Sequence, residues 1–399
     1  MVDLGNLMKE IRKAIELVKG FDSALLIHHD DADGITSAAI MVRTLEELGL
    51  SVKPICLEKL FEETLSLISS QPYDLFIYVD IGSPHSPLIA DKLAGRYALI
   101  LDHHNPKEIK CANLINLNPE LFGFSGERDA SGATMAFLFS KEALGSAYGE
   151  LAALAVIGSA EIPGKLGGLN AIALKEGIKA GKVKAVEGRR GIEYLVNLEG
   201  AWKSYKTISR DLTALASVGY YRGGPLKALK ALTEGGYHTL SREISYLEEL
   251  RRKKLREVIK LISKGGLREL KFVQWFHVGD LLKGLGSKTI GTIASYLSYR
   301  PSLIKSNKYL LAAMNYERII PGLGEIKGKY SKFSARAPLT LRERIGSGDA
   351  PPIASLLEPI ARAFNGFFDG HDFAASGLIP RGSEGNFVEA VDLELSRSL

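Results

Sequence analysis

The chain has 399 residues, of which 46% are hydrophobic, 24% charged and 8% aromatic, so we expect two or three folded domains rather than a disordered or fibrous chain. The 51 Lys and Arg against 46 Asp and Glu give a formal charge of +5, which permits a nucleic-acid partner without requiring one. With two cysteines, a disulfide framework is excluded and a reducing, cytoplasmic location is expected. No run of about 18 uncharged apolar residues occurs, so no membrane span is expected.

The first part of the chain predicts alternating strands and helices. Short apolar runs at 24–27, 75–79 and 98–101 are typical of buried parallel strands, and a helix is expected from Thr36 to about Leu48. This pattern predicts a doubly wound, mainly parallel α/β sheet.

The rest of the chain is expected to be mostly helical at first and mixed later. A loop rich in Gly, Ser and Asn covers 118–132, and helical patterns continue from Ala133 to about Leu232. A long charged helix is expected from Thr239 to about Lys264. Strands at 271–276 and 309–315 and a helix that starts within 284–292 predict a second, smaller α/β domain. The predicted boundaries are 1–235 for the first domain, 236–266 for the connecting helix and 267–399 for the second domain.

Each of the three buried strands ends in acids or histidines. The polar groups are His28 to Asp33, then Asp80, then Asp102-His103-His104. Ligands of open α/β sheets lie at the carboxyl ends of the strands, where these groups can meet. Carboxylates crowded in this way need cations, and mixed Asp and His ligands suit Mn²⁺, Mg²⁺ or Zn²⁺. Any one motif alone would be read as a helix cap or a turn, but three in one sheet predict a metal site for phosphoryl transfer to water.

These residues resemble a known family. His29 to Gly34, Asp80 to Ser83 and Asp102 to His104 look like the first three motifs of the DHH phosphoesterases. Gly370 to Gly377 resembles the GGHxxAAG motif of the family's DHHA1 substrate-binding domain, and Lys332 to Arg336 resembles a strand of that domain. Asn116 to Thr134 resembles the archaeal RecJ-like branch of single-strand exonucleases.

The resemblance implies two Mn²⁺ ions, with Mg²⁺ as a substitute. His29, Asp31 and Asp80 would hold one ion, and Asp33, Asp80 and His103 the other, so that Asp80 bridges the two. His104 would contact the scissile phosphate or support a ligand, and Asp102 would orient the histidines.

The fourth family motif departs from the pattern, because 155–162 lacks its aspartate. Glu161 is the candidate replacement, and the alternative is an acid at a helix end that binds no metal.

In the second domain, Gly370 and Gly377 would let the backbone approach a phosphate, while His371 and Arg336 could donate to it. Ser334 belongs to the same motif, and Ser131 lies in the loop that the branch places near the substrate.

The resulting prediction is a metal-dependent phosphodiesterase, a single-strand-specific exonuclease acting on DNA, RNA or both in replication or repair. Possible partners are the single strand itself and a replication or repair helicase, and a monomer is expected by default. Two alternatives stay open at this point: a phosphodiesterase for short oligoribonucleotides or cyclic dinucleotides, and a non-catalytic scaffold associated with a helicase.

Overall fold

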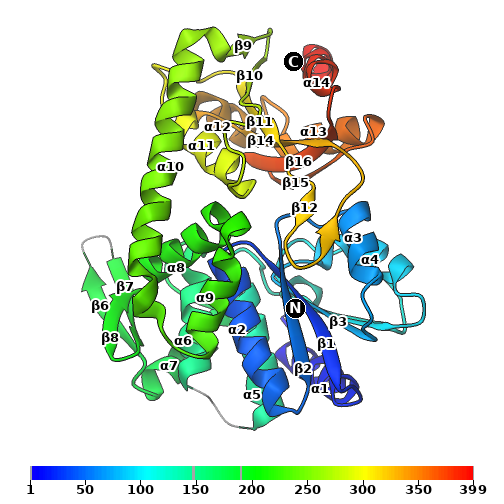
Figure 1. Cartoon of the computed structure of the whole chain (residues 1–399), viewed down its shortest axis with the longest axis vertical. Helices are drawn as coiled ribbons and strands as arrows, with labels where there is room; N and C mark the ends of the chain where they lie inside the picture. Colours follow the sequence, from blue (N-terminus) through cyan, green and yellow to red (C-terminus); the bar gives the residue numbers. More distant parts are fainter. Residues whose placement is uncertain (1, 146–148, 189–190, 399) are drawn as a thin grey trace. The chain divides into compact units, whose positions relative to one another are not determined.

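The computed structural model describes residues 2–145, 149–188 and 191–398 (Figure 1). The chain divides into two compact units, the first made of residues up to 245 together with 320–325, and the second of 246–319 together with 326 onward. The expected long helix is confirmed as α10, Ser241–Leu261, and it contributes residues to both units.

A parallel sheet forms the centre of the first unit. Within the described residues it has the strand order β2-β1-β3-β4-β5, and every neighbouring pair is parallel. This confirms the predicted α/β class. The strands are β1 (Ser23–His29), β2 (Ser51–Leu57), β3 (Leu75–Val79), β4 (Tyr97–Leu101) and β5 (Leu114–Leu117).

Strands β2 and β5 are the two edges of this sheet and were not predicted. An edge strand is covered less completely, so its sequence need not be a continuous apolar run. Strand β2 carries Lys53 and Pro54, and proline is tolerated at sheet edges because no neighbour needs its missing N–H.

Helices pack around the sheet of the first unit, and α2 lies beside β1 and β2 (Figure 1). Helix α2 begins at Ala32, four residues before the expected start, because the Asp31 side chain accepts a hydrogen bond from the Gly34 N–H at 3.0 Å and caps the helix. The helices are α1 (Leu4–Val18), α2 (Ala32–Glu47), α3 (Glu62–Ser69), α4 (Ser86–Lys92), α5 (Gly132–Leu144), α6 (Gly149–Gly158), α7 (Asn170–Lys179), α8 (Tyr205–Thr213) and α9 (Gly224–Thr233).

The expectation of mostly helical structure over 133–232 is wrong for residues 183–188 and 191–204. Three antiparallel strands form there: β6 (Val183–Gly188), β7 (Gly191–Leu198) and β8 (Ala201–Ser204). The turn between β7 and β8 has Glu199 and Gly200 at positive φ, 51° and 86°, which matches the twist of a hairpin. Cross-strand pairing thus prevails over the helical pattern in this segment.

The second unit contains a mixed sheet with the order β15-β16-β14-β11-β10-β9 among the described residues. Side chains of β14, such as Phe333 and Ala335, pack into an apolar core with α13 and α14 on one face. Helix α11 contacts β14 and β11. The elements are β9 (Arg268–Glu269), β10 (Val273–His277), α11 (Lys288–Ser298), β11 (Tyr309–Asn315), β14 (Tyr330–Arg336), α12 (Leu339–Gly346), α13 (Ile353–Ala363), β15 (Phe367–His371), β16 (Ala374–Pro380) and α14 (Glu384–Ser398). A separate pair of strands, β12 (Ile319–Ile320) and β13 (Gly324–Glu325), lies in the segment 319–325, of which 320–325 belong to the first unit.

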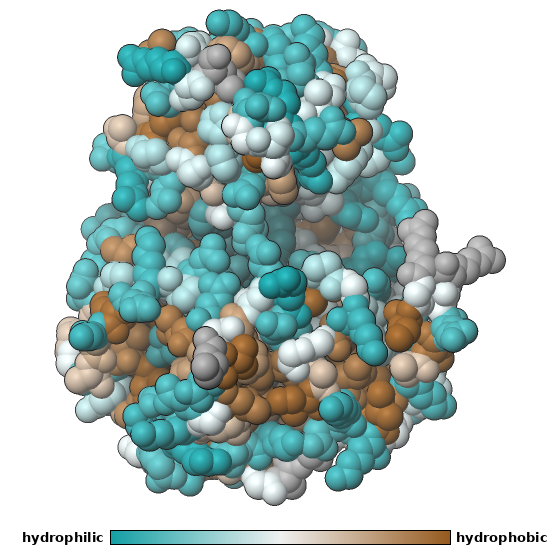
Figure 2. Space-filling view, turned by 180° about the vertical axis from the view of Figure 1, so that it is seen from behind, coloured by the Kyte–Doolittle hydropathy of each residue, from teal (hydrophilic) through white to brown (hydrophobic). Residues whose placement is uncertain are grey.

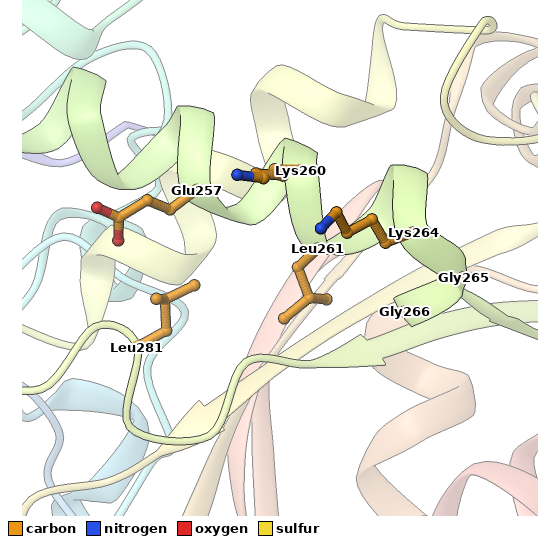
Figure 3. A pocket seen from close by; sticks show the side chains of 7 residues that line it. All are labelled: Glu257, Lys260, Leu261, Lys264, Gly265, Gly266 and Leu281. Carbon is orange, nitrogen blue, oxygen red and sulfur yellow. The ribbon is translucent and has the colours of Figure 1, made fainter.

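On the face drawn in Figure 2, hydrophilic side chains cover much of the surface and hydrophobic ones gather in smaller groups. Among the described residues, no helix is both long and apolar enough to cross a membrane. A surface pocket of about 570 Å³ lies at the end of α10 (Figure 3). Its lining has one acid and no histidine, so it offers no metal-ligand set: Glu257, Lys260, Leu261, Lys264, Gly265, Gly266 and Leu281.

Candidate metal centre

The candidate site lies at the carboxyl ends of three adjacent strands. His29 ends β1, Asp80 follows β3 and Asp102 follows β4, and these strands are neighbours in the sheet. The chain leaves β1 toward β2 on one side, and β3 then pairs on the other side of β1. Successive strands are therefore added to the sheet in opposite directions on the two sides of β1. Open α/β sheets bind ligands at such a switch point, which here lies between β1 and β3.

Two sets of possible metal ligands share one carboxylate. His29, Asp31 and Asp80 offer ligand atoms within 4.8 Å of one another, and Asp80, His103 and His104 do the same. His29 Nδ1 lies 2.8 Å from Asp31 Oδ2 and 3.7 Å from Asp80 Oδ2. On the other side, His103 Nε2 lies 3.4 Å from Asp80 Oδ1. The geometry thus brings Asp80 between the two sets, as a bridging ligand requires.

Asp80 is held in an unfavourable position. Its φ of 57° lies in the left-handed region, which costs a residue with a side chain about 1 kcal/mol or more. The side chain is buried, and burial together with the charges of Asp33 and Asp31 raises the pKa of Asp80 well above its usual value. Strain and crowded charge of this kind concentrate at functional sites.

Asp33 approaches the same centre from the first turn of α2. Its two oxygens accept hydrogen bonds from the N–H groups of Gly132 and Ala133, at 2.8 and 2.7 Å, at the start of α5. Its Oδ2 also lies 3.5 Å from His103 Nε2. Burial and the charge of Asp31 raise the pKa of Asp33 to about 7, although these hydrogen bonds lower it. A nearby cation would favour its ionised form.

A backbone carbonyl sets the orientation of the His103 ring. Its Nδ1 lies 2.7 Å from the carbonyl oxygen of Gly126, which can only accept, so Nδ1 carries the proton. Nε2 therefore presents a lone pair toward Asp33 and Asp80. Burial, followed by the charge of His104, lowers the pKa of His103 to about 4. This neutral ring is in the form that binds a metal ion.

Asp102 is an anion that holds the two histidines. It is fully buried and accepts from the N–H groups of Ser83 and His103, both at 2.8 Å, and from Nδ1 of His104 at 2.7 Å. Burial alone would raise the pKa of Asp102, but the charge and hydrogen bond of His104 outweigh it and lower the pKa well below its usual value. For His104, burial by itself would lower the pKa, but the charge and hydrogen bond of Asp102 outweigh burial and raise the pKa of His104 to about 9. His104 is therefore suited to donate to an anion such as a phosphate oxygen.

The donor set fits divalent cations. Asp80 Oδ1 and Asp30 Oδ2 are buried and accept no hydrogen bond from the described part of the chain. Such orphaned carboxylate oxygens are costly unless a cation takes them. Carboxylate oxygens combined with neutral imidazole are the ligands that Mn²⁺ and related ions accept.

Several glycines make the site possible, and the sequence motifs alone do not explain them. At four positions a Cβ atom would collide with the backbone or side chain of a candidate ligand residue: Gly34 against His29, Gly126 against His103, Gly132 against Asp80 and Gly158 against Asp33. The absent side chain of Gly132 lets the start of α5 approach Asp80, and that of Gly158 lets the end of α6 approach Asp33.

Sequence reasoning also missed the polar side chains that support the site. The Asn118 side-chain amide donates to the Ser83 hydroxyl at 3.0 Å and to the His104 carbonyl at 2.7 Å, fixing the loop that carries both histidines. The buried Asn170 accepts from Thr134 at 2.6 Å and from Ser159 at 3.1 Å at the start of α5. Asn118 lies within the stretch Asn116 to Thr134 that resembles the RecJ-like branch, and this resemblance was the available signal for the first of these contacts.

Two predicted site residues of the first unit lie apart from the ligand sets. The Ser131 hydroxyl is buried and caps α5 by accepting from the Thr134 N–H at 3.1 Å. Glu161 is exposed in a short turn, η3 (Ser159–Glu161), and belongs to neither set of ligands within the described residues. The geometry does not support these two roles, which stay predictions.

In the second unit, Arg336 and Ser334 lie on the face of β14 that α11 covers. Arg336 Nε donates to the Ser295 hydroxyl at 2.8 Å, and its other nitrogens donate to backbone carbonyls. Burial, followed by the charge of Arg342, lowers the pKa of Arg336 to about 10, so it stays a cation at neutral pH. The buried Ser334 hydroxyl has no hydrogen-bond partner among the described residues.

The predicted glycine motif forms the antiparallel pair β15 and β16. Arg336 pairs with Ala374, which pairs with His371, so Arg336 and His371 lie on the same face of the sheet. His371 and Gly370 are exposed at the end of β15. Gly377 is buried, and a Cβ there would collide with Phe367 and Phe368. Strand packing therefore explains Gly377, and a phosphate contact at this position stays a prediction.

Comparison with known proteins finds a family profile that matches the part of the chain containing the candidate ligands. The profile described as the DHH family, N-terminal domain, matches residues 23–159, which include all the ligands of both sets. An uncharacterised protein of Methanocaldococcus jannaschii is 24% identical over 96% of this chain and 97% of its own length. The single-stranded-DNA-specific exonuclease RecJ of Thermus thermophilus is 31% identical over 188 aligned residues. The aligned segment covers 43% of this chain and 28% of that enzyme.

A solved structure extends the similarity to the whole fold. The RecJ structure of Thermus thermophilus in complex with Mn²⁺ superposes with a TM-score of 0.64 at 20% identity, covering 99% of this chain and 55% of RecJ. The two proteins share a fold along the length of this chain, which spans about half the length of that RecJ chain.

Proposed function

We propose that this chain, whose residues 23–159 belong to the DHH family, is a metal-dependent phosphodiesterase and most specifically a single-strand exonuclease. The observation that carries the proposal is the position of Asp80, whose two carboxylate oxygens face His29 and His103 from between two ligand sets. A shared carboxylate is what two ions acting on one phosphate need.

The ligand roles proposed are those that the family resemblance implies, with Asp33 in place of His104 in the second set, because Asp33 Oδ2 lies 3.5 Å from His103 Nε2 and Asp102 accepts from His104. His29, Asp31 and Asp80 would hold one ion, and Asp33, Asp80 and His103 the second. When bound, Mn²⁺ or Mg²⁺ would neutralise the phosphate and activate water as a Lewis acid. The chain's own part is to orient these ligands: Gly126 fixes the His103 ring, and the start of α5 fixes Asp33.

His104 and Asp102 would act on the substrate phosphate. Because Asp102 keeps the His104 ring protonated, the ring can donate a hydrogen bond from Nε2 to a phosphate oxygen. The positive charge of the His104 ring would stabilise the transition state more than the ground state, because negative charge gathers on the phosphate oxygens in the transition state.

Arg336, His371 and Ser334 would bind the phosphates of the strand. Arg336 pairs with no carboxylate among the described residues, so its charge is available to an anion. RecJ of Thermus thermophilus is named for its specificity for single-stranded DNA, and we extend a single-strand substrate, DNA or RNA, to this chain. We also propose a role in replication or repair beside a helicase.

The test uses a long single strand labelled at either end, the same strand as RNA, and a dinucleotide. Each is incubated with Mn²⁺, with Mg²⁺ and with chelator, using the wild type and Asp80→Asn. Metal-dependent shortening of the long strand by the wild type alone is the expected result and reveals the polarity. Cleavage of the dinucleotide alone would move the function to short substrates. Binding of the strand without any cleavage would favour the non-catalytic scaffold.

A further inference from the structure

Three aromatic rings are exposed together on the second unit. Tyr296 and Tyr299 project from the end of α11, and Phe373 from the turn between β15 and β16, with 37%, 57% and 38% of their surfaces exposed. Tyr299 leaves more than half of its surface exposed, whereas large aromatic side chains usually bury most of theirs. A group of exposed rings from separate elements therefore points to a binding surface.

Two arginines lie over these rings. The Arg300 guanidinium is 4.6 Å from the centre of the Tyr296 ring, and the Arg342 guanidinium is 5.1 Å from Tyr299 and 5.9 Å from Phe373. Within the described residues, neither arginine has a carboxylate partner. We call these five residues the stacking patch: Tyr296, Tyr299, Arg300, Arg342 and Phe373.

Hydrogen bonds fix the patch to the strand that carries Arg336. Arg342 Nε donates to the Ala337 carbonyl at 2.8 Å, and the Ala337 N–H donates to the Phe373 carbonyl at 2.9 Å. Ser295, which accepts from Arg336, lies four residues before Tyr299 on the same stripe of α11. The stacking patch is therefore a continuation of the surface on which Arg336 could bind a phosphate.

We propose that the stacking patch binds the unpaired bases of a single-stranded nucleic acid, while the neighbouring arginines contact its phosphates. The inference rests on the proposed single-strand substrate and adds a base-binding site: Phe373 stands at a variable position of the glycine motif, and the other four residues lie outside the family motifs. Flat rings with an unpaired arginine suit the faces of bases, and every base has such a face, so the patch would bind without sequence preference. The faces of bases in a double helix are covered by their neighbours, so a duplex would be excluded.

The test separates bases from phosphates. Binding in chelator is measured by fluorescence anisotropy with a labelled oligothymidylate of about 12 nucleotides and with a strand of equal length whose sugars carry no bases. Tyr299→Leu and Phe373→Leu should each weaken binding of the oligothymidylate about five- to tenfold, as expected for one lost stack, and change binding of the baseless strand about twofold at most. Tyr246→Leu is the matched control, because Tyr246 is 50% exposed on α10, outside the patch.

Equal losses for both strands, or unchanged binding in both patch variants, would overturn the assignment. No binding of either strand by the wild type would also overturn it and would leave a protein as the partner of this surface. Hydrolysis is scored separately in Mn²⁺. A wild type that binds bases through the patch but cleaves nothing would refute the phosphodiesterase and uphold the stacking patch.

Discussion

Replacing Gly132 with alanine tests whether close packing of α5 positions the shared ligand. A Cβ at Gly132 would lie 2.6 Å from Asp80 Cβ and 2.7 Å from Asp80 Oδ1. The Cβ–Cβ distance of 2.6 Å is about 0.8 Å shorter than the lower limit of ordinary van der Waals contact between carbon atoms. Because the Gly132 N–H also donates to Asp33, the helix cannot move away without drawing on a second candidate ligand.

The expected effects follow from that displacement. Misplacing a catalytic group by about 1 Å can cost roughly 100-fold in rate, so Gly132→Ala should reduce Mn²⁺-dependent hydrolysis by about that factor. Overpacking of this kind usually lowers the free energy of unfolding by about 1–3 kcal/mol, which would leave a protein of this size folded. Gly167→Ala is the matched control, since its Cβ would meet nothing closer than 4.0 Å.

The assays are Mn²⁺ titration by calorimetry, hydrolysis of a labelled single strand, and urea denaturation in chelator. Gly132→Ala should bind Mn²⁺ more weakly and cleave more slowly while its unfolding stays cooperative. Wild-type Mn²⁺ affinity and wild-type hydrolysis in this variant would refute the argument that contact with α5 positions Asp80.

Five further substitutions and conditions are informative. Asp80→Asn should abolish Mn²⁺ binding and hydrolysis, yet raise the unfolding free energy of the metal-free protein by about 1 kcal/mol, because a crowded buried charge is removed; lower stability in urea would contradict this. Mn²⁺ must displace the proton of Asp33, whose pKa is raised to about 7, so affinity should rise about tenfold per pH unit up to about pH 7, and a pH-independent affinity would refute the assigned ionisation. The raised pKa of Asp33 also affects the stability of the metal-free protein. Between the unfolded pKa of about 4 and the folded pKa of about 7, the free energy of unfolding should fall as pH rises, because the folded protein keeps the proton that the unfolded chain has lost. Asp33→Asn should remove this pH dependence from urea unfolding curves. Arg336→Ala should raise KM for a single strand more than it lowers kcat, whereas a collapsed kcat at unchanged KM would exclude a binding role. Asn118→Ala should slow hydrolysis about tenfold by releasing the His104 loop, and wild-type kinetics would show that the loop is held elsewhere.

Local sequence determined the central strands and the chemistry at their ends. Strands β3 and β11 have the predicted bounds, because a strand buried on both faces must be a continuous apolar run that stops where polar residues begin. Asp80 and His103 could therefore be assigned to strand ends before their neighbours in space were known. The long helix α10 was equally evident, because its charged residues repeat at helical spacing and two glycines follow it.

Tertiary structure decided which of these residues meet and what holds them there. The order of strands places β3 beside β1, so that Asp80 faces both His29 and His103. Gly132 contacts Asp33 across 99 positions of sequence, and no local pattern records such a contact. The Ser131 N–H likewise donates to the side chain of Asn170 at 3.1 Å, a partner 39 positions away in the sequence. The sequence by itself thus specified the ligand types, and packing between distant segments specified their geometry, because a residue's partners in space are set by the fold rather than by its neighbours along the chain.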